Sequence, residues 1–127
     1  MRALADTSLF VALEQQRPLA DTPPDELSIS VMTLAELQLG VLQAHTPAIQ
    51  SQRLRTLQAV RESIDALPVD EAVASRFADM AAELRAAGRR TPIVDLLIAA
   101  TAIRHELPIC TQDRDFDHYP DLRVLRI

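Results

Sequence analysis

A stretch of eleven residues, Pro92–Ala102, limits what this chain can fold into more than any other part of the sequence. It is almost wholly apolar and holds a single acid, Asp95. The run Leu96–Ala100 is entirely apolar, which predicts a helix that other parts of the protein surround on most sides. A carboxylate on such a helix is costly unless a cation or several hydrogen-bond donors meet it. Asp95 is therefore either an acid that favours the start of its helix or one corner of a site.

Short apolar runs that alternate with helical patterns predict the rest of the architecture. Strands are predicted at Arg2–Ala5, Leu27–Met32, Ala66–Val69, Pro108–Thr111 and Arg123–Arg126. Helices are predicted after the capping residues Thr7 and Ser8, at Thr33–Ala44, at Pro47–Ile64, from Asp70 to Ala87, where Gly88 ends the helix, and from Thr91 to His105. Such alternation is typical of a parallel sheet with helices on both faces. We therefore expect residues 1–127 to form a single α/β domain with three layers, α/β/α, around a mainly parallel sheet of four to five strands.

The charge of the chain bears on the partners that it can bind. The sequence has 13 arginines, no lysine and 18 acids, so its net charge is −5 and its pI is about 5.1. An acidic chain binds nucleic acid poorly, unless its acids hold divalent cations that reverse the local sign of the charge. Aromatic residues make up only 3% of the chain, so a single-stranded nucleic acid would be held mainly through its phosphates and sugars.

Cysteine content and hydropathy indicate where the protein works. Cys110 is the only cysteine, so no internal disulfide forms and nothing points to an oxidising compartment. The N-terminal residues show no signal-peptide pattern. No run approaches the ~18 apolar residues that a membrane-spanning helix needs. We expect a cytoplasmic protein without a membrane partner.

Four acids fall where a parallel α/β sheet places its ligand site. Asp6 and Asp113 come just after the first and fourth predicted strands, and Glu36 and Asp95 fall in the first turns of two helices. Ligands bind beyond the carboxyl ends of such strands, so these positions are compatible with one cleft. Three of the acids also have simpler explanations. Asp6 is a candidate helix cap, Glu36 completes a capping box with Thr33, and Asp113 is a typical turn residue.

Taken together, the four acids resemble the motifs of the PIN-domain nucleases. Those motifs place an acid after the first strand, at a T-x-x-E-L helix start, before an I-A-A helix and in a T-x-D-x-D-F turn. In this chain the corresponding segments are ADTS with Asp6, TLAELQLGV with Glu36, PIVDLLIAATA with Asp95 and CTQDRDF with Asp113. The resemblance covers essentially the whole chain. The compact size and the E-L-x-x-G-V element, with Gly88 and Pro92 before Asp95, are similar to the VapC-type toxins within that family.

The resemblance implies a metal-dependent endoribonuclease that cleaves RNA phosphodiester bonds. Such a toxin inhibits translation or growth, is itself inhibited by a cognate antitoxin protein, and often forms a homodimer. Carboxylate oxygens suit Mg²⁺ or Mn²⁺. We expect the metal ligands Asp6, Asp95 and Asp113, with Glu36 at the rim and Asp115 as an alternative ligand. We further expect Thr7, Ser8 and Thr111 to orient water or phosphate, and Arg89, Arg90 and Arg114 to contact RNA. Without metal, the mutual repulsion of the acids should raise the pKa of at least one of them.

Other functions fit the residues less well. A response-regulator receiver domain needs a lysine late in the chain, and a haloacid-dehalogenase-type phosphatase needs D-x-D where this chain has Ser8. His45, His105 and His118 are too widely separated for a zinc site. The main alternative is a PIN fold without catalysis that binds RNA or protein, and the presence of all four acids argues against it.

Overall fold

A five-stranded parallel sheet forms the centre of the protein, whose computed structural model describes residues 1–127. Its strands are β1 (Arg2–Ala5), β2 (Glu26–Ser30), β3 (Asp65–Leu67), β4 (Ile109–Thr111) and β5 (Val124–Arg126), in the spatial order β3-β2-β1-β4-β5. All four strand pairs are parallel, which confirms the predicted parallel sheet. The chain adds β2 and β3 on one side of β1 and then crosses to add β4 on the other. The switch in strand order therefore lies at β1, with its carboxyl end next to that of β4.

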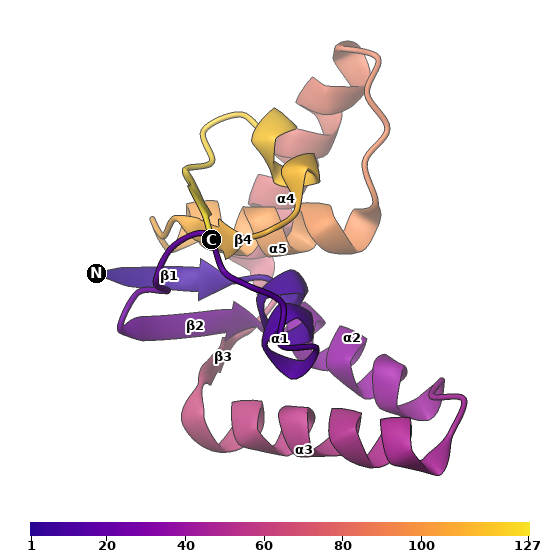
Figure 1. Ribbon diagram of the computed structural model, residues 1–127. Coiled ribbons are helices and arrows are strands. Elements are labelled where there is room, and N and C mark those ends of the chain that lie inside the picture. Colours follow the sequence, from indigo (N-terminus) through magenta and orange to yellow (C-terminus); the bar gives the residue numbers. More distant parts are fainter.

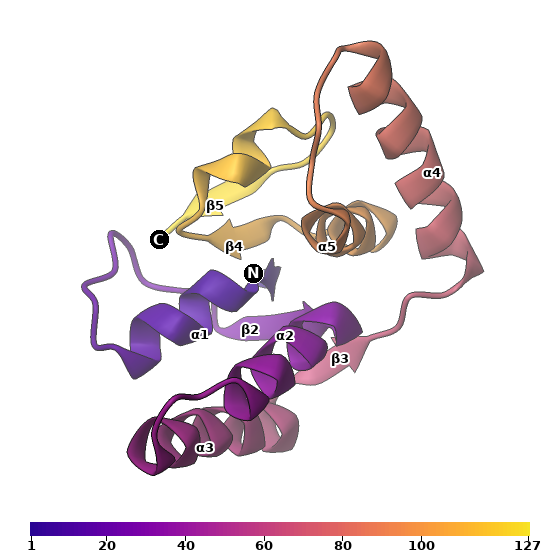
Figure 2. The same ribbon diagram turned by 90° about the vertical axis from the view of Figure 1, so that its right-hand side faces the viewer.

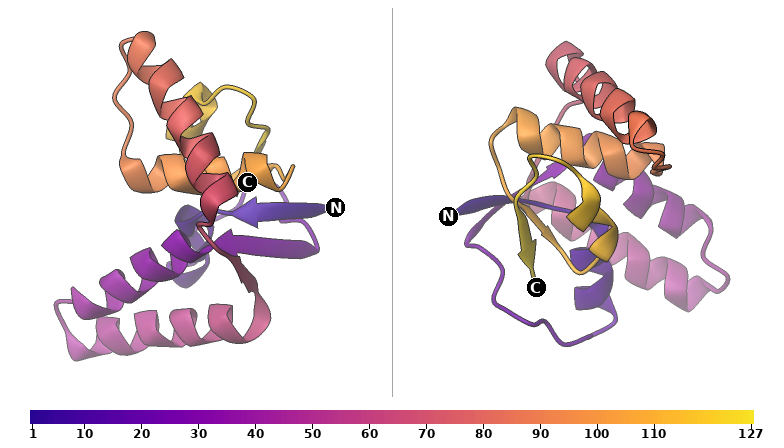
Figure 3. Two further views of the ribbon diagram at one scale, coloured as in Figure 1. Left: turned by 180° about the vertical axis from the view of Figure 1, so that it is seen from behind. Right: turned by 90° about the horizontal axis from the view of Figure 1, so that it is seen from above.

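Helices cover both faces of the sheet, as predicted. They are α1 (Thr7–Glu14), α2 (Val31–Leu42), α3 (Pro47–Ser63), α4 (Glu71–Ala86) and α5 (Ile93–Arg104), and a 3₁₀ helix, η1 (Arg114–His118), follows β4. Figures 1 and 2 show α1 and α3 on one face and α4 and α5 on the other. The α2–α3 hairpin extends beyond the carboxyl ends of the strands, as the view from behind in Figure 3 also shows.

The side chains of β1 alternate between two separate cores. Leu4 packs with α4, α5 and η1, whereas Ala3 and Ala5 pack with α1 and α3. The neighbouring strand β4 alternates in the same way, since Ile109 belongs to the first core and Cys110 to the second. Both faces of the central strands are therefore apolar, as expected for a parallel sheet with a helical layer on each side.

Helix α5 is surrounded by protein, as its composition predicts. Six of its residues are buried: Leu96, Ile98, Ala99, Ala100, Thr101 and Ala102. The alanines allow close packing, and the one buried hydroxyl, that of Thr101, donates to the carbonyl of Leu97 at 2.8 Å. Figure 3 shows α4 lying across α5 on its side away from the sheet. No helix of the protein has the length and apolar character that crossing a membrane requires.

A Schellman motif ends α4 and directs the chain toward α5. Gly88 has φ +74°, a left-handed conformation that costs glycine least. Its N–H donates to the carbonyl of Arg85 at 3.0 Å, and the N–H of Arg89 donates to that of Leu84 at 2.9 Å. These two bonds confirm Gly88 as the residue that ends the helix. They also fix the direction in which the connection to α5 leaves.

The boundaries of α2 and β2 differ from the sequence prediction. The strand ends at Ser30 and the helix already begins at Val31, because the Ser30 hydroxyl caps the helix by accepting from the N–H of Met32 at 3.1 Å. Thr33 is therefore inside the helix and buried, and the capping box of Thr33 with Glu36 is wrong. Thr91 likewise caps nothing. Pro92 stands at the N-cap of α5, and no side chain caps that helix.

Truncating a side chain on the buried face of α5 should destabilise the protein strongly. Ile98 is 1% exposed, so Ile98→Ala removes buried methyl groups and leaves a cavity that costs about 2–5 kcal/mol. Ile93 on the same helix is 62% exposed, and Ile93→Ala should change stability by no more than about 0.5 kcal/mol. Denaturant unfolding of the two variants measures the difference. Equal losses would contradict the burial of α5.

Candidate active site

Each of the predicted acids lies near the carboxyl edge of the sheet, on a different element. Asp6 directly follows β1, and its N–H donates to the carbonyl of Cys110 in β4 at 3.1 Å. Glu36 lies in the second turn of α2 and Asp95 in the first turn of α5. Asp113 is the N-cap of η1. The acids thus come from segments far apart in sequence that meet at the switch between β1 and β4.

Three carboxylates form the tightest part of this site. Asp95, Asp113 and Asp115 each place one oxygen within 4.8 Å of the others. Asp115, the alternative ligand, therefore joins Asp113 in the cluster instead of replacing it. Asp6 and Glu36 lie outside this cluster but close enough to act on it electrostatically. The charge of Glu36 raises the pKa of Asp95, and the charges of Asp113 and Asp95 raise the pKa of Asp6.

Hydroxyl groups hold the Asp6 carboxylate in place. Asp6 is 5% exposed, and its Oδ1 accepts a hydrogen bond from Ser8 Oγ at 2.7 Å. Ser8 Oγ lies 3.2 Å from Thr111 Oγ1 and accepts from the N–H of Gln112 at 3.0 Å. This network ties the end of β1 to the end of β4. Asp6, and not Thr7 or Ser8, occupies the N-cap position of α1, but its side chain makes no capping bond, so capping does not explain its carboxylate.

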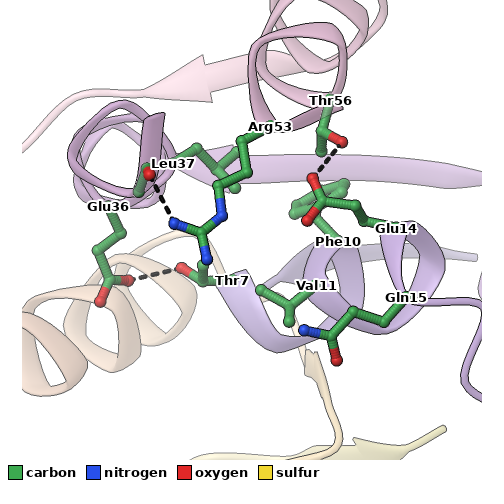
Figure 4. A pocket seen from close by; sticks show the side chains of 10 residues that line it. Thr7, Phe10, Val11, Glu14, Gln15, Glu36, Leu37, Arg53 and Thr56 are labelled. Atoms are coloured by element: carbon green, nitrogen blue, oxygen red, sulfur yellow. Dashed lines mark hydrogen bonds between the residues drawn. The ribbon is translucent and has the colours of Figure 1, made fainter. Parts of the chain in front are cut away.

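Glu36 is held by a hydrogen bond from the neighbouring helix. Thr7 Oγ1 donates to Glu36 Oε1 at 2.5 Å and so joins the start of α1 to α2, as Figure 4 shows. The second carboxylate oxygen of Glu36 has no hydrogen-bond partner within the protein. The position of Glu36 is therefore set by a contact between two helices and not by the cap of its own helix.

Asp113 has both a structural and an electrostatic part in the site. Its Oδ1 accepts from the N–H of Asp115 at 2.9 Å, which confirms the predicted turn role. Arg126 Nη1 donates to the Asp113 carbonyl at 2.7 Å, and its Nη2 pairs with Asp117 Oδ1 at 2.5 Å. Arg126 thus anchors η1 on β5 and neutralises Asp117 outside the cluster. Nothing in the sequence marked Arg126 for this role, because its partners are known only once β4 and β5 pair.

Burial and mutual repulsion raise the pKa values of two acids, as predicted. Burial raises the pKa of Asp6 to about 6, the hydrogen bonds from Ser8 and Thr111 act against it, and the charges of Asp113 and Asp95 add to it. Burial also raises the pKa of Asp95 to about 6, with further contributions from the charges of Glu36, Asp113 and Asp115. Protonation of Asp6 and Asp95 is therefore easier in the metal-free folded protein than in the unfolded chain, and a bound cation would oppose it.

The donors of the cluster fit Mg²⁺ or Mn²⁺. All three are carboxylates, and neither of the two salt bridges in the chain involves any of them. Oxygen-only donors are typical ligands of these hard cations. The histidines do not contribute, since His45 follows α2, His105 caps the end of α5 and His118 ends η1.

The arginines expected to contact RNA lie in two places. Arg114 begins η1 between the two acids Asp113 and Asp115, whereas Arg89 and Arg90 lie in the connection from α4 to α5. Arg89 and Arg90 line a hollow that Arg114 does not line. The two groups are positioned by different turns of the chain.

A cavity of about 210 Å³ lies next to the acids, between α1, α2 and α3. Thr7 and Glu36 line the cavity, so their hydrogen bond forms part of its wall (Figure 4). Arg53 reaches into it from α3 and donates to the carbonyl of Gly40 at 2.7 Å. Glu14 Oε1 accepts from Thr56 Oγ1 at 2.7 Å on the far side. The cavity thus mixes apolar walls with charges of both signs.

The chain belongs to the PIN domain family, since the model of that family matches residues 3–122. It is similar to Ribonuclease VapC4 of Mycobacterium tuberculosis, with 45% identity over 99% of this chain and 97% of that protein. Ribonuclease VapC5 of the same organism is 43% identical over 96% of this chain and 93% of that protein. The crystal structure of VapBC-5, a member of the VapBC family of toxin–antitoxin systems from Mycobacterium tuberculosis, matches with a TM-score of 0.87 and 39% identity. That match covers 99% of this chain and 98% of the other.

Removing the charge of Asp6 should stabilise the metal-free protein. Folding raises the pKa of Asp6 to about 6, so between about pH 4 and 6 the folded chain binds more protons than the unfolded chain. The contribution of Asp6 to the free energy of unfolding is then highest below this pH range and falls as the pH rises through it. At about 1.4 kcal/mol per pKa unit, the loss is up to about 3 kcal/mol. We expect Asp6→Asn, with EDTA present, to melt above the wild type at about pH 7.5 and to lose this advantage near pH 4.

Asp79→Asn provides the control for this prediction. Asp79 is exposed on α4, lies outside the acidic cluster and makes no side-chain hydrogen bond. Its substitution should leave the melting temperature and its pH dependence close to those of the wild type. A metal-free Asp6→Asn variant that is less stable than the wild type at about pH 7.5 would contradict the raised pKa of Asp6.

Proposed function

We propose that this protein is a metal-dependent endoribonuclease and the toxin of a toxin–antitoxin pair, with residues 1–127 as one nuclease domain. The observation that carries the proposal is the cluster of Asp95, Asp113 and Asp115 within 4.8 Å, flanked by Asp6 and Glu36. Relatives of nearly full length are named ribonucleases, and the similar structure VapBC-5 belongs to a toxin–antitoxin family. An RNA substrate and a toxin role also favour a cytoplasmic location.

In this proposal, Asp95 and Asp113 hold Mg²⁺ or Mn²⁺ together with Asp115, and Asp6 completes the acidic environment. When bound, the cation supplies positive charge to the RNA phosphate and lowers the pKa of a water molecule. Glu36 has one oxygen engaged by Thr7 and one free, so it can accept a hydrogen bond or a proton from a water molecule at the rim. Arg114 lies next to the acids and meets the charge of the RNA phosphates.

The hydroxyl groups are best assigned to positioning. Ser8 donates to Asp6 and accepts from the N–H of Gln112. Thr111 accepts from the N–H of Asp113 at 2.8 Å. We therefore assign Ser8 and Thr111 to holding Asp6 and Asp113, and Thr7 to holding Glu36. Preorganised carboxylates of this kind avoid a cost of rearrangement when cation and substrate bind.

The face formed by α1, α2 and α3 is the proposed site for the antitoxin. Large apolar side chains stay exposed on it, namely Leu13 at 52%, Leu39 at 51% and Leu42 at 69%. An apolar helix laid on this face would cover them, and a basic side chain could enter the adjacent cavity toward Glu36. Co-purification with the product of a neighbouring small gene tests this partner. The resemblance also implies a homodimer, which sedimentation equilibrium measures.

Removing the charge of Asp95 should abolish cleavage of RNA. Asp95→Asn deletes one of the three charges of the cluster, and we expect at least about a 100-fold loss in rate with Mg²⁺ or Mn²⁺ present. Asp79→Asn, an exposed acid changed in the same way, should keep the wild-type rate. Cleavage of a labelled RNA by the purified proteins measures both. Equal cleavage by all three would indicate a contaminating nuclease, and no cleavage by the wild type would favour the non-catalytic alternative.

Divalent cations should stabilise the fold. A cation that binds only the folded state at 100 times its Kd adds about 2.7 kcal/mol, which raises the melting temperature by several degrees. The gain should be larger at about pH 7.5 than at about pH 5, because the ligand Asp95 must lose its proton and the ionised form of the neighbouring Asp6 strengthens the attraction for the cation. Thermal melts with millimolar Mg²⁺ or Mn²⁺ measure it, with Asp95→Asn showing a smaller gain. A wild-type melt that does not respond would argue against the metal site.

A further inference from the structure

A second hollow, of about 390 Å³, lies between α4 and the start of α5. Three arginines and no acid line it, although the chain as a whole has a net charge of −5. Arg85 comes from the last turn of α4, and Arg89 and Arg90 come from the connection to α5. All three are exposed, and the two salt bridges of the chain use other arginines. The hollow is therefore a concentration of unpaired positive charge.

The backbone presents these arginines in a defined way. The Schellman motif at Gly88 fixes the N–H of Arg89 on the carbonyl of Leu84 at 2.9 Å, so the arginines leave α4 in a set direction. The start of α5 lies in the same region, and its dipole is already met by Asp95 in the first turn. The arginines, and not the helix end, are therefore the groups that favour an anion.

The wall of the hollow holds the only Phe or Tyr side chain that is not buried. The chain has four such residues, and Phe10, Phe116 and Tyr119 are all at most 5% exposed. Phe77 is half-buried on α4 and lines the hollow beside Ile93, which is 62% exposed. A chain with so few aromatic residues therefore presents its one accessible ring next to its unpaired arginines.

The hollow lies beside the acidic cluster. Ile93 and Leu96 line the hollow, and Asp95, between them in sequence, belongs to the cluster. The first turn of α5 thus separates the two sites, and a helix with its side chains is only about 10–12 Å across. A strand of RNA with one phosphate at the acids would reach the arginines within a few nucleotides.

We propose that this hollow binds a nucleotide of the RNA substrate next to the scissile phosphate. Arg85, Arg89 and Arg90 bind its phosphate, for which the guanidinium fork is well suited. Phe77 and Ile93 contact its base, because unpaired bases pack on aromatic and apolar side chains. The inference rests on the proposed ribonuclease function and adds the place where the substrate is held outside the acids.

The test measures RNA binding and RNA cleavage separately. Binding is measured by fluorescence anisotropy with a labelled single-stranded RNA of randomised sequence, in the Asp95→Asn background. Arg89→Gln with Arg90→Gln should raise the Kd at least about tenfold and reduce the slope of log Kd against log salt by about 1.4, or about 0.7 per contact. Phe77→Leu, which keeps an apolar side chain in the wall, should raise the Kd at least about fivefold. Arg55→Gln, an exposed arginine on α3, is the control and should change neither.

With Asp95 intact, the same arginine changes should raise KM for RNA and leave kcat within about twofold, since the acids are untouched. An unchanged Kd in the arginine and Phe77 variants would overturn the inference. So would variants that keep their RNA affinity but lose an acidic protein partner, since the hollow would then be a protein-docking site. A wild type that cleaves no RNA, while the variants still weaken binding, would refute the proposed nuclease and leave the RNA site standing.

Discussion

The burial and crowding of carboxylates are the constraint on which the arrangement of this protein depends. Asp95, Asp113 and Asp115 each place one carboxylate oxygen within 4.8 Å of the others. Asp6 is buried near them, and its pKa is raised to about 6. In the absence of a cation such a group of acids destabilises the fold. The rest of the molecule must offset this cost, and it does so with two apolar cores, one on each face of β1. The acids lie at the carboxyl edge of the sheet, next to the switch in strand order between β1 and β4.

The acids keep their positions because each is tied to a different element. Ser8 and Thr111 connect the ends of β1 and β4, Thr7 connects α1 to Glu36 on α2, and Arg126 ties η1 to β5. The packing of α5 against the sheet and α4 supplies the last connection, for Asp95. A shift of any one element would therefore move one acid relative to the others. Rigid placement of this kind is what a cation site of few ligands needs.

The net charge of the chain hides two regions of opposite sign. The acids lie on one side of the first turn of α5, and the hollow with Arg85, Arg89 and Arg90 lies on the other. A nucleic acid backbone is repelled by the first region until cations are bound, and is attracted by the second at all times. An overall charge of −5 is thus compatible with an RNA substrate, because the attraction is local. Three of the four aromatic side chains are buried, and only Phe77 is accessible to a base.

The sequence by itself determined the parallel sheet, the buried helix around Asp95 and the placement of Asp6 and Asp113 after strands. These features follow from hydrophobic periodicity and from the cost of burying a carboxylate, which are properties of short segments. Only the tertiary structure showed how Glu36 is held. Ser30 caps α2, so Glu36 does not take part in the cap and instead accepts a hydrogen bond from the hydroxyl of Thr7 in α1. The tertiary structure also brought Asp115 into the cluster beside Asp113 and left Phe77 accessible. The Thr7–Glu36 contact, the approach of Asp95 to Asp113 and Asp115, and the exposure of Phe77 depend on residues far apart in the chain, which no local pattern encodes.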